Sequence, residues 1–369
     1  MGHAIVRDLA AEDDFSVVVV DVDPVAVEQL TEFGADGIVA DLSVPDTVGR
    51  ALAATEADLV VGAVPGFMGY QTVERVLQEG RPVVDISFFP EDARGLQDLA
   101  KKAEVPCLVD CGIAPGFTNL ILGRMEEELD DTHSFQCLVG GLPVERTWPW
   151  DYKAPFSPGD VIEEYVRPAR VRRDGKEITL PALSEPELVN FPGLGTLEAF
   201  NTDGLRSLLH TCDTPNMVEK TMRYPGHAER MRVLREAGFF SSREIQAASG
   251  SVRPRDVTEA LLFSAWQFEE GEPDLTVMRI VVEGTKDGRD VRHTFNLLDY
   301  YNPDTETSSM ARTTGYTCTA MVRLVARGLW KEPGLATPEI VGRSEACYQS
   351  VRDHLEARGV HIFERVDEL

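Results

Sequence analysis

Short apolar segments alternate with amphipathic segments along the first 120 residues of the chain. The runs VVVV (17–20) and LVVGAV (59–64) are apolar at successive positions, which is typical of parallel strands covered by helices on both faces of a sheet. The pattern predicts strands at 17–21, 37–40, 58–64, 82–86 and 106–110. It predicts helices between them at 24–33, 45–54, 69–79 and 91–103. This spacing indicates an α/β domain with a Rossmann-type parallel sheet.

The pattern changes after Gly116, where longer polar segments and alternating strands begin. Strand-like alternation at 275–284 and 292–301 predicts a mixed or antiparallel sheet. A helix expected at 308–328 is rich in small residues and is expected to return to the first domain. We therefore predict a dinucleotide-binding domain at 1–120 that about 306–369 completes, and an inserted α+β domain at 121–305.

The first residues look like the second half of a mononucleotide-binding unit. A helix predicted from Ala4 to Leu9 precedes the strand that ends at Asp21, so Gly2 takes the place of the third glycine in G-x-G-x-x-G. We expect the first strand of this unit to be missing and Met1 to be an internal residue of a longer ancestral sequence. The alternative is an ordinary glycine before an N-terminal helix. Asp21 is placed to bind the adenosine ribose, which favours NAD over NADP.

Composition excludes several classes of partner and site. A net charge of −26 disfavours nucleic acid and anionic membranes as partners. The sequence shows neither a long apolar run nor a basic leader segment, so a cytoplasmic location is expected. The 6 cysteines form no CxxC cluster, and the 7 histidines show no HExxH spacing. We therefore predict reduced thiols and no metal site.

Several strings resemble the saccharopine dehydrogenase family, and most closely its L-lysine 6-dehydrogenase branch. They are VVDISFFPED (83–92), VDCGIAPGFTNL (109–120), VGGLP (139–143), YKAPFSPGDVIEEYVRPAR (152–170), EAFNTDGLRSLL (198–209), EKTMRYPGHAERM (219–231) and MARTTGYT (310–317). The resemblance covers nearly the whole chain. It implies a Rossmann domain, an inserted α+β domain that supplies substrate contacts, and a homodimer or higher homo-oligomer.

The resemblance implies NAD-dependent oxidation of an amine. Saccharopine reductases carry an acidic residue in G-L-D-P-G, where this chain has Ala114, so free L-lysine is the preferred substrate. The expected reaction on the ε-amine yields 2-aminoadipate 6-semialdehyde, ammonia and NADH. Saccharopine or carboxynorspermidine chemistry is the alternative within enzymes. A dinucleotide-binding sensor without catalytic activity is the alternative outside them.

Strand ends and the resemblance together supply the candidate site residues. The residues expected to contact NAD are Gly2, Asp21, Asp41, Ala63, Val64, Pro65, Ser87 and Cys111. The residues expected to bind an amino-acid substrate are Ser87, Trp150, Tyr152, Asp203, Arg223 and Tyr224. The guanidinium of Arg223 suits a carboxylate because it offers two parallel hydrogen bonds. Its alternative role is a surface ion pair.

Three residues are candidates for proton transfer, and each has a structural alternative. Asp110 ends a strand beside the expected nicotinamide position, where burial would raise its pKa; otherwise it is a capping or turn residue. His227 titrates in the right range, but it follows Pro-Gly and is equally typical of a turn. If Lys153 is desolvated, it would polarise the water that attacks the imine formed by oxidation of the amine. Otherwise Lys153 is exposed to solvent. Asp203 has helix capping as its alternative, and Glu163 and Glu164 are expected to be structural.

Overall fold

The computed structural model describes residues 1–44, 46–155, 158–248 and 250–369, which form two compact units. Unit 1 comprises Met1–Glu127 and Ala311–Val360, and unit 2 comprises Glu128–Met310 and His361–Leu369. The predicted return of the chain to the first domain is therefore found up to Val360. The expectation was wrong for the last residues, because strand β17 (Ile362–Glu368) pairs with β15 of unit 2.

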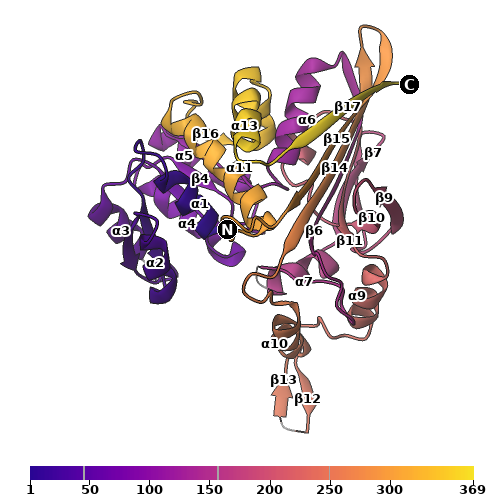
Figure 1. The fold of residues 1–369 in the computed structure, drawn as a ribbon, viewed down its shortest axis with the longest axis horizontal. Helices are drawn as coiled ribbons and strands as arrows, with labels where there is room; N and C mark the ends of the chain where they lie inside the picture. Colours follow the sequence, from indigo (N-terminus) through magenta and orange to yellow (C-terminus); the bar gives the residue numbers. More distant parts are fainter. Residues whose placement is uncertain (45, 156–157, 249) are drawn as a thin grey trace. The chain divides into compact units, whose positions relative to one another are not determined.

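Unit 1 is an α/β unit of parallel strands and helices (Figure 1). Its strands are β1 (Val18–Asp21), β2 (Asp36–Val39), β3 (Val60–Gly62), β4 (Val83–Asp85), β5 (Pro106–Leu108) and β16 (Gly334–Ala336). Its helices are α1 (Gly2–Ala10), α2 (Pro24–Thr31), α3 (Thr47–Thr55), α4 (Gly66–Gln78), η1 (Ala93–Leu96), α5 (Gln97–Ala103), α6 (Phe117–Glu128), α11 (Ser309–Ala326), α12 (Pro338–Gly342) and α13 (Glu345–Ala357). The predicted alternation of strands and helices is confirmed.

The strands of unit 1 form two separate parallel ladders. One contains β1 and β2, and the other has the order β16-β5-β4-β3. Among the described residues no ladder joins β1 to β3. Val83 and Val84 are both buried although they point to opposite faces, so the prediction of strands covered on both sides is confirmed for β4. It is wrong for β1, which is only half-buried, and for β2, which is mostly exposed. The core around them is formed by apolar side chains of α4, α5 and the strands.

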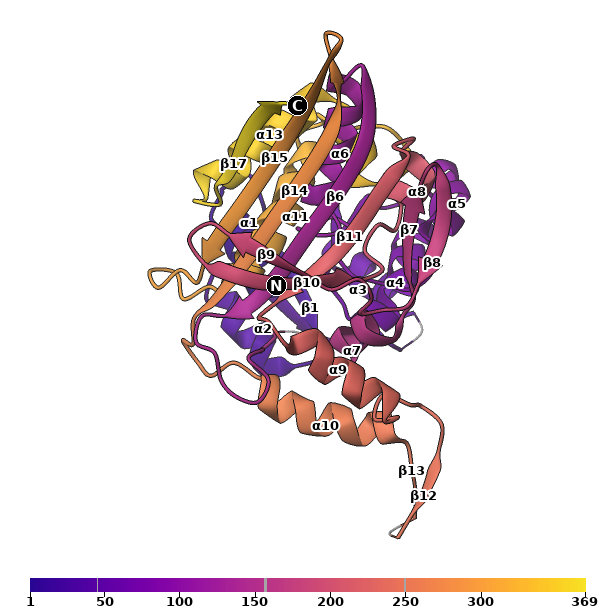
Figure 2. The same ribbon diagram turned by 90° about the vertical axis from the view of Figure 1, so that its right-hand side faces the viewer.

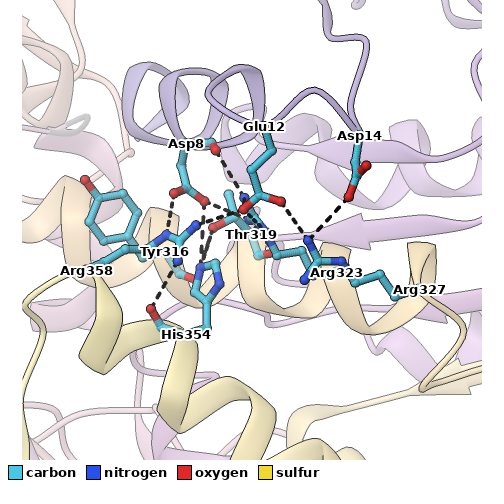
Figure 3. A network of polar contacts seen from close by, with 9 residues as sticks. All are labelled: Asp8, Glu12, Asp14, Tyr316, Thr319, Arg323, Arg327, His354 and Arg358. Carbon is cyan, nitrogen blue, oxygen red and sulfur yellow. Dashed lines mark hydrogen bonds and ion pairs between the residues drawn. The ribbon is translucent and has the colours of Figure 1, made fainter.

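A network of charged side chains connects three helices of unit 1 (Figure 3). Arg323 of α11 donates to Asp8 of α1 at 2.8 Å and to Glu12, just beyond α1, at 2.7 Å. Arg358, which follows α13, also pairs with Asp8. Burial acts to raise the pKa of Asp8, but Thr319 and the two arginines outweigh it and lower that pKa. Asp8 is thus a carboxylate whose charge the folded state stabilises.

Unit 2 is built on a nine-stranded sheet, which Figure 2 shows with its long strands side by side. Its strands are β6 (Asp131–Pro143), β7 (Ala169–Arg173), β8 (Lys176–Leu180), β9 (Glu187–Phe191), β10 (Gly195–Asn201), β11 (Asn216–Arg223), β14 (Asp274–Lys286), β15 (Arg289–Tyr300) and β17. The main order is β17-β15-β14-β6-β11-β10-β9, and β7 pairs with β11 and β8. All pairs are antiparallel except β11 with β6, which is the mixed sheet that the sequence predicts.

The described helices of unit 2 are α7 (Pro158–Val166), α8 (Leu208–Thr211), α9 (His227–Glu236) and α10 (Pro254–Trp266). Side chains of α7, α9 and α10 contribute to an aromatic core. A hairpin of β12 (Ile245–Ala247) and β13 (Gly250–Val252) precedes α10. Thr258, Leu262 and Trp266 recur every four residues and form the buried face of α10. Trp266 packs edge to face on Tyr152 and joins α10 to the core beside β11.

Candidate active site

The carboxyl ends of β1 and β2 in unit 1 carry the two acidic residues expected to contact a dinucleotide. Asp21 is the last residue of β1, and its Oδ1 accepts the backbone N–H of Asp23 at 2.9 Å. Asp41 follows β2 and accepts both the N–H and the hydroxyl of Ser43, which lower its pKa. Each carboxylate therefore lies in a short turn at the strand edge where open α/β sheets bind ligands.

The segment from β3 to α4 holds Ala63, Val64 and Pro65 close to the chain that follows β4. A Cβ on Gly66 would lie 2.7 Å from the carbonyl oxygen of Phe88, so this turn requires glycine. No side chain caps the first turn of α4. Backbone N–H groups at such a helix start are suitable donors for polar groups of a cofactor.

A buried carboxylate at the end of β4 holds Ser87. Asp85 Oδ1 accepts the backbone N–H of Ser87 at 2.9 Å and its hydroxyl at 2.6 Å. A Cβ on Gly62 would lie 2.0 Å from Asp85 Oδ2, so the neighbouring strand must carry glycine there. Our sequence reasoning missed Asp85. The signal was present, because Asp85 ends an apolar strand just as Asp21 does.

The loop after β5 contains Asp110 and Cys111. Asp110 is buried and has a left-handed backbone with φ of 59°. Burial raises the pKa of the Cys111 thiol well above its usual value, which keeps the thiol protonated. Gly116 ends the loop with φ of 142°, and a Cβ there would lie 1.8 Å from the carbonyl oxygen of Gly112. The backbone of this loop therefore requires glycine at this position.

Most of the residues of unit 1 that we discuss as dinucleotide contacts offer suitable hydrogen-bond donors or acceptors. Asp21 offers a carboxylate to ribose hydroxyls, and the β3–α4 turn offers backbone N–H groups. Gly2 differs, because it is already the first residue of α1 and a Cβ added there would meet nothing within 4 Å. Packing therefore gives no reason for glycine at that position. The fingerprint role of Gly2 stays a prediction.

In unit 2, Arg223 is the last residue of β11 and is buried. Its Nη2 donates to Glu164 Oε2 at 2.8 Å and to the Tyr152 hydroxyl at 3.3 Å. Its Nη1 donates to the Met222 carbonyl at 3.0 Å, and its Cζ lies 4.5 Å from the centre of the Tyr152 ring. Its Nε is buried and has no partner among the described residues. Arg223 is thus a desolvated cation with one donor unused, and the expected alternative of a surface ion pair was wrong.

Arg223 ends a polar row on one face of β11, formed by Glu219, Thr221 and Arg223. Alternate residues of a strand share a face, and all three side chains are buried. The Thr202 hydroxyl donates to Glu219 at 2.7 Å and lies 2.9 Å from the Thr221 hydroxyl. Burial, partly offset by Thr202, raises the pKa of Glu219 to about 8.

His227 lies in the aromatic core beside this row. Its Nδ1 is 3.5 Å from the Trp150 carbonyl, which can only accept, so Nε2 accepts the Tyr165 hydroxyl at 2.9 Å. Burial, followed by the charge of Arg223, lowers the pKa of His227 to about 3. The imidazole is therefore neutral and a weak base at neutral pH. The alternative that His227 is only a turn residue describes its position incompletely, because His227 is the first residue of α9.

The structure brings Tyr152, Arg223 and His227 together and gives other candidates separate partners. Lys153 pairs with Glu272 at 2.5 Å. Asp203 accepts the Arg170 guanidinium at 2.9 and 3.0 Å, and it does not cap α8, whose N-cap is Ser207. The Tyr224 hydroxyl donates to the Pro143 carbonyl at 2.9 Å. Phe156 and Ser157 of the quoted YKAPFSP string lie outside the described residues.

Glu164, which we expected to be structural, is the main residue that sequence reasoning missed. It follows Val161 by three residues on α7 and precedes Tyr165, and both of these neighbours are buried in the core. A carboxylate on the apolar side of a helix needs a partner, and this position was the available signal. Its partner Arg223 lies 59 residues away, on a strand.

Two searches of the described residues found no further kinds of site. No group of three or more His, Cys, Asp or Glu side chains is placed to hold a metal ion in those residues. Over the same part of the chain, every helix is too short or too polar to span a membrane. All six cysteines lie within the described part, and all are buried and free of disulfides.

Comparison with family models covers most of the chain. A model described as "Saccharopine dehydrogenase C-terminal domain" matches residues 112–360, and one described as "TrkA-N domain" matches residues 1–96. Two similar proteins are both named "Saccharopine dehydrogenase [NADP(+), L-glutamate-forming]". The protein from Pyricularia oryzae is 24% identical over 355 positions, covering 76% of this chain and 79% of its own. The protein from Saccharomyces cerevisiae is 24% identical over 442 positions, covering 99% and 97%.

Two solved structures share the fold. Apo saccharopine dehydrogenase (L-Glu forming) from Saccharomyces cerevisiae gives a TM-score of 0.80 at 21% identity, covering 99% of this chain and 97% of that one. Homospermidine synthase from Legionella pneumophila, in complex with NAD, gives a TM-score of 0.65 at 12% identity, covering 99% and 89%. The 112–360 match confirms the predicted resemblance to the saccharopine dehydrogenase family, and the two structures confirm the fold. The resemblance to the L-lysine 6-dehydrogenase branch stays a prediction.

Proposed function

Because the chain belongs to the saccharopine dehydrogenase family, we propose that it is an NAD-dependent oxidoreductase acting on an amine of an amino acid. The proposed substrate is L-lysine, whose ε-amine carbon is oxidised to give 2-aminoadipate 6-semialdehyde, ammonia and NADH after addition of water. The observation that carries this proposal is the buried guanidinium of Arg223 with an unpartnered Nε. A desolvated guanidinium is suited to bind the carboxylate of an amino acid.

The residues of unit 1 support a nicotinamide cofactor and favour NAD. When bound, the cofactor supplies the hydride acceptor. Asp21 and Asp23 place two carboxylates after β1, with Val22 between them and no arginine. A 2′-phosphate at this edge would be repelled by these charges. The named relatives carry NADP(+) in their names, so this preference distinguishes the proposal from them.

Proton transfer is assigned to Asp110 before Lys153 or His227. The amine that is oxidised must lose a proton, and the acceptor needs a lone pair. Lys153 is held in an ion pair with Glu272, and both nitrogens of His227 lie against Trp150 and Tyr165. Asp110 is a buried residue at the carboxyl edge of β5, where a cofactor is expected.

Saccharopine oxidation is the second candidate function. The names of the relatives favour it. The loop between Gly112 and Gly116 argues against it, because Ala114 supplies a methyl group where saccharopine reductases are expected to carry a carboxylate.

A turnover assay tests the proposal. Purified protein is mixed with NAD or NADP and with L-lysine or saccharopine, while reduced cofactor and the aldehyde product are measured. We expect turnover of L-lysine with NAD, and Arg223→Ala should raise KM for lysine by about tenfold or more without changing the Kd for NAD. Arg232→Ala, which removes an exposed arginine paired with Glu229, is the matched control. Turnover of saccharopine alone, or of no amine, contradicts the lysine assignment.

A further inference from the structure

We propose that Glu164 and Arg223 together bind the head group of an α-amino acid, with Arg223 taking the α-carboxylate and Glu164 taking the α-ammonium. This inference rests on the proposed function and names the residue that would select amino acids over simple carboxylates. It depends on one juxtaposition, the 2.8 Å contact between Arg223 Nη2 and Glu164 Oε2. Asp203, the other acidic residue that we expected to bind substrate, accepts two hydrogen bonds from the Arg170 side chain.

The two partners differ in exposure in the way that a binding site requires. The Arg223 side chain is 4% exposed and that of Glu164 is 27% exposed. Glu164 is therefore the more exposed partner, and Arg223 is the more deeply buried one. Arg223 is fixed by the Met222 carbonyl and by the Tyr152 ring. Its buried Nε is a donor that has no hydrogen-bond partner within the described part of the chain.

Charge balance explains why a zwitterion suits this pair. A ligand that binds Arg223 through a carboxylate alone would place two negative charges, its own and that of Glu164, against one guanidinium. Glu164 would then have no cation of its own. Leaving a partly buried charge unpaired is costly. An α-amino acid brings one charge of each sign on neighbouring atoms, so both protein charges keep an opposite partner. A diamine without a carboxylate would pair Glu164 and leave Arg223 uncompensated.

Neighbouring acidic residues are engaged elsewhere. Glu163 lies one residue earlier on α7 and pairs with Arg255 at 2.6 Å and with Arg167 at 3.6 Å. Glu219 accepts the Thr202 hydroxyl within the polar row of β11. Glu164 is thus the carboxylate that contacts Arg223, and Glu163 provides a matched control on the same helix.

Calorimetric titration of the full chain tests the inference without relying on turnover. Wild type, Glu164→Gln and Glu163→Gln are titrated with two pairs of ligands: L-lysine against 6-aminohexanoate, and L-2-aminoadipate against adipate. Each pair differs by the α-ammonium. We expect wild type and Glu163→Gln to bind an α-amino acid about tenfold or more tightly than its partner, and Glu164→Gln to lose about tenfold of that preference. Thermal unfolding checks that each variant is folded.

The outcomes separate this inference from the proposed reaction. An unchanged preference in folded Glu164→Gln overturns the role of Glu164. Failure of wild type to bind either α-amino acid, or loss of preference in Glu163→Gln equal to that in Glu164→Gln, also overturns it. A preference that depends on Glu164 in a protein that turns over no lysine supports the head-group site and rejects only the proposed reaction.

Discussion

Glu219 shows at the scale of one residue how burial controls a charge. Its pKa is raised from an ordinary 4.5 to about 8, so the folded state holds a proton that the unfolded chain releases between these values. The stability that the protonated Glu219 gives to the folded state is complete below the pKa of 4.5 in the unfolded chain. It is lost as the pH rises through the pKa of about 8 in the folded state. Buried Glu219 therefore weakens unit 2 in alkaline solution.

We expect Glu219→Gln to stabilise the protein increasingly as the pH rises from about 5 to about 9, because a neutral amide replaces a carboxyl that must otherwise ionise while buried. At the upper end the gain should correspond to roughly 3 °C or more in Tm. Scanning calorimetry at several pH values measures it. Glu229→Gln, at an exposed position of α9, should show a flat difference. A flat difference for Glu219→Gln as well would contradict the assignment.

The position of a single residue could be predicted where the local sequence around it determines that position. Asp21 and Asp110 follow apolar strands, so their place at the carboxyl edge could be read from the sequence. Arg223 was identified through a resemblance, and its burial became visible only with its partners. Glu164 was missed because an ion pair between residues 59 positions apart leaves no local pattern. His227 was assigned from its ordinary pKa, which burial changes.

At the scale of elements, the network of Asp8, Glu12, Arg323 and Arg358 fastens α1 to α11 and α13. Such buried pairs contribute little net stability when intact, but removing one partner leaves an uncompensated charge. Arg323 is 5% exposed and contacts both acids, whereas Arg327, the residue after α11, is 55% exposed and pairs with Glu12. The two arginines therefore carry the same charge and differ in burial.

We expect Arg323→Ala to lower the free energy of unfolding of unit 1 by about 3–5 kcal/mol, since Asp8 would lose one of its compensating cations. Arg327→Ala should cost less than about 1 kcal/mol because its ion pair is exposed. Urea denaturation followed by circular dichroism compares the two variants. Equal losses for both would show that the network does not depend on burial.

Elements were predictable where their periodicity is local. Strands β1 to β5 of unit 1 and the long helix α11 were predicted to within a few residues of their observed ends. The short β16 was missed, since three residues, Gly334–Ala336, carry too little pattern to distinguish a strand from a loop. The placement of β17 was wrong because pairing with β15 depends on a register that a single strand does not encode.

At the scale of the whole molecule, both units are completed by residues beyond Met310. Unit 1 needs α11 and α13 to neutralise Asp8, and unit 2 needs β17 to cover the edge of β15. We expect a chain truncated after Met310 to lose cooperative unfolding of both units, as measured by calorimetry. A chain truncated after Val360 should keep the unit 1 transition. Cooperative melting of the shorter chain would contradict this dependence.

This arrangement has a consequence for biosynthesis. At about 5–20 residues per second, a ribosome would need several seconds or more after finishing β15 to produce Arg358 and β17. During that interval Asp8 lacks Arg358, and it lacks Arg323 as well until residue 323 has been made, while the long β15 presents an open edge to other nascent chains. We therefore expect both units to be completed only after β17 has been synthesised, and molecular chaperones that shield strand edges to improve the yield of folded protein.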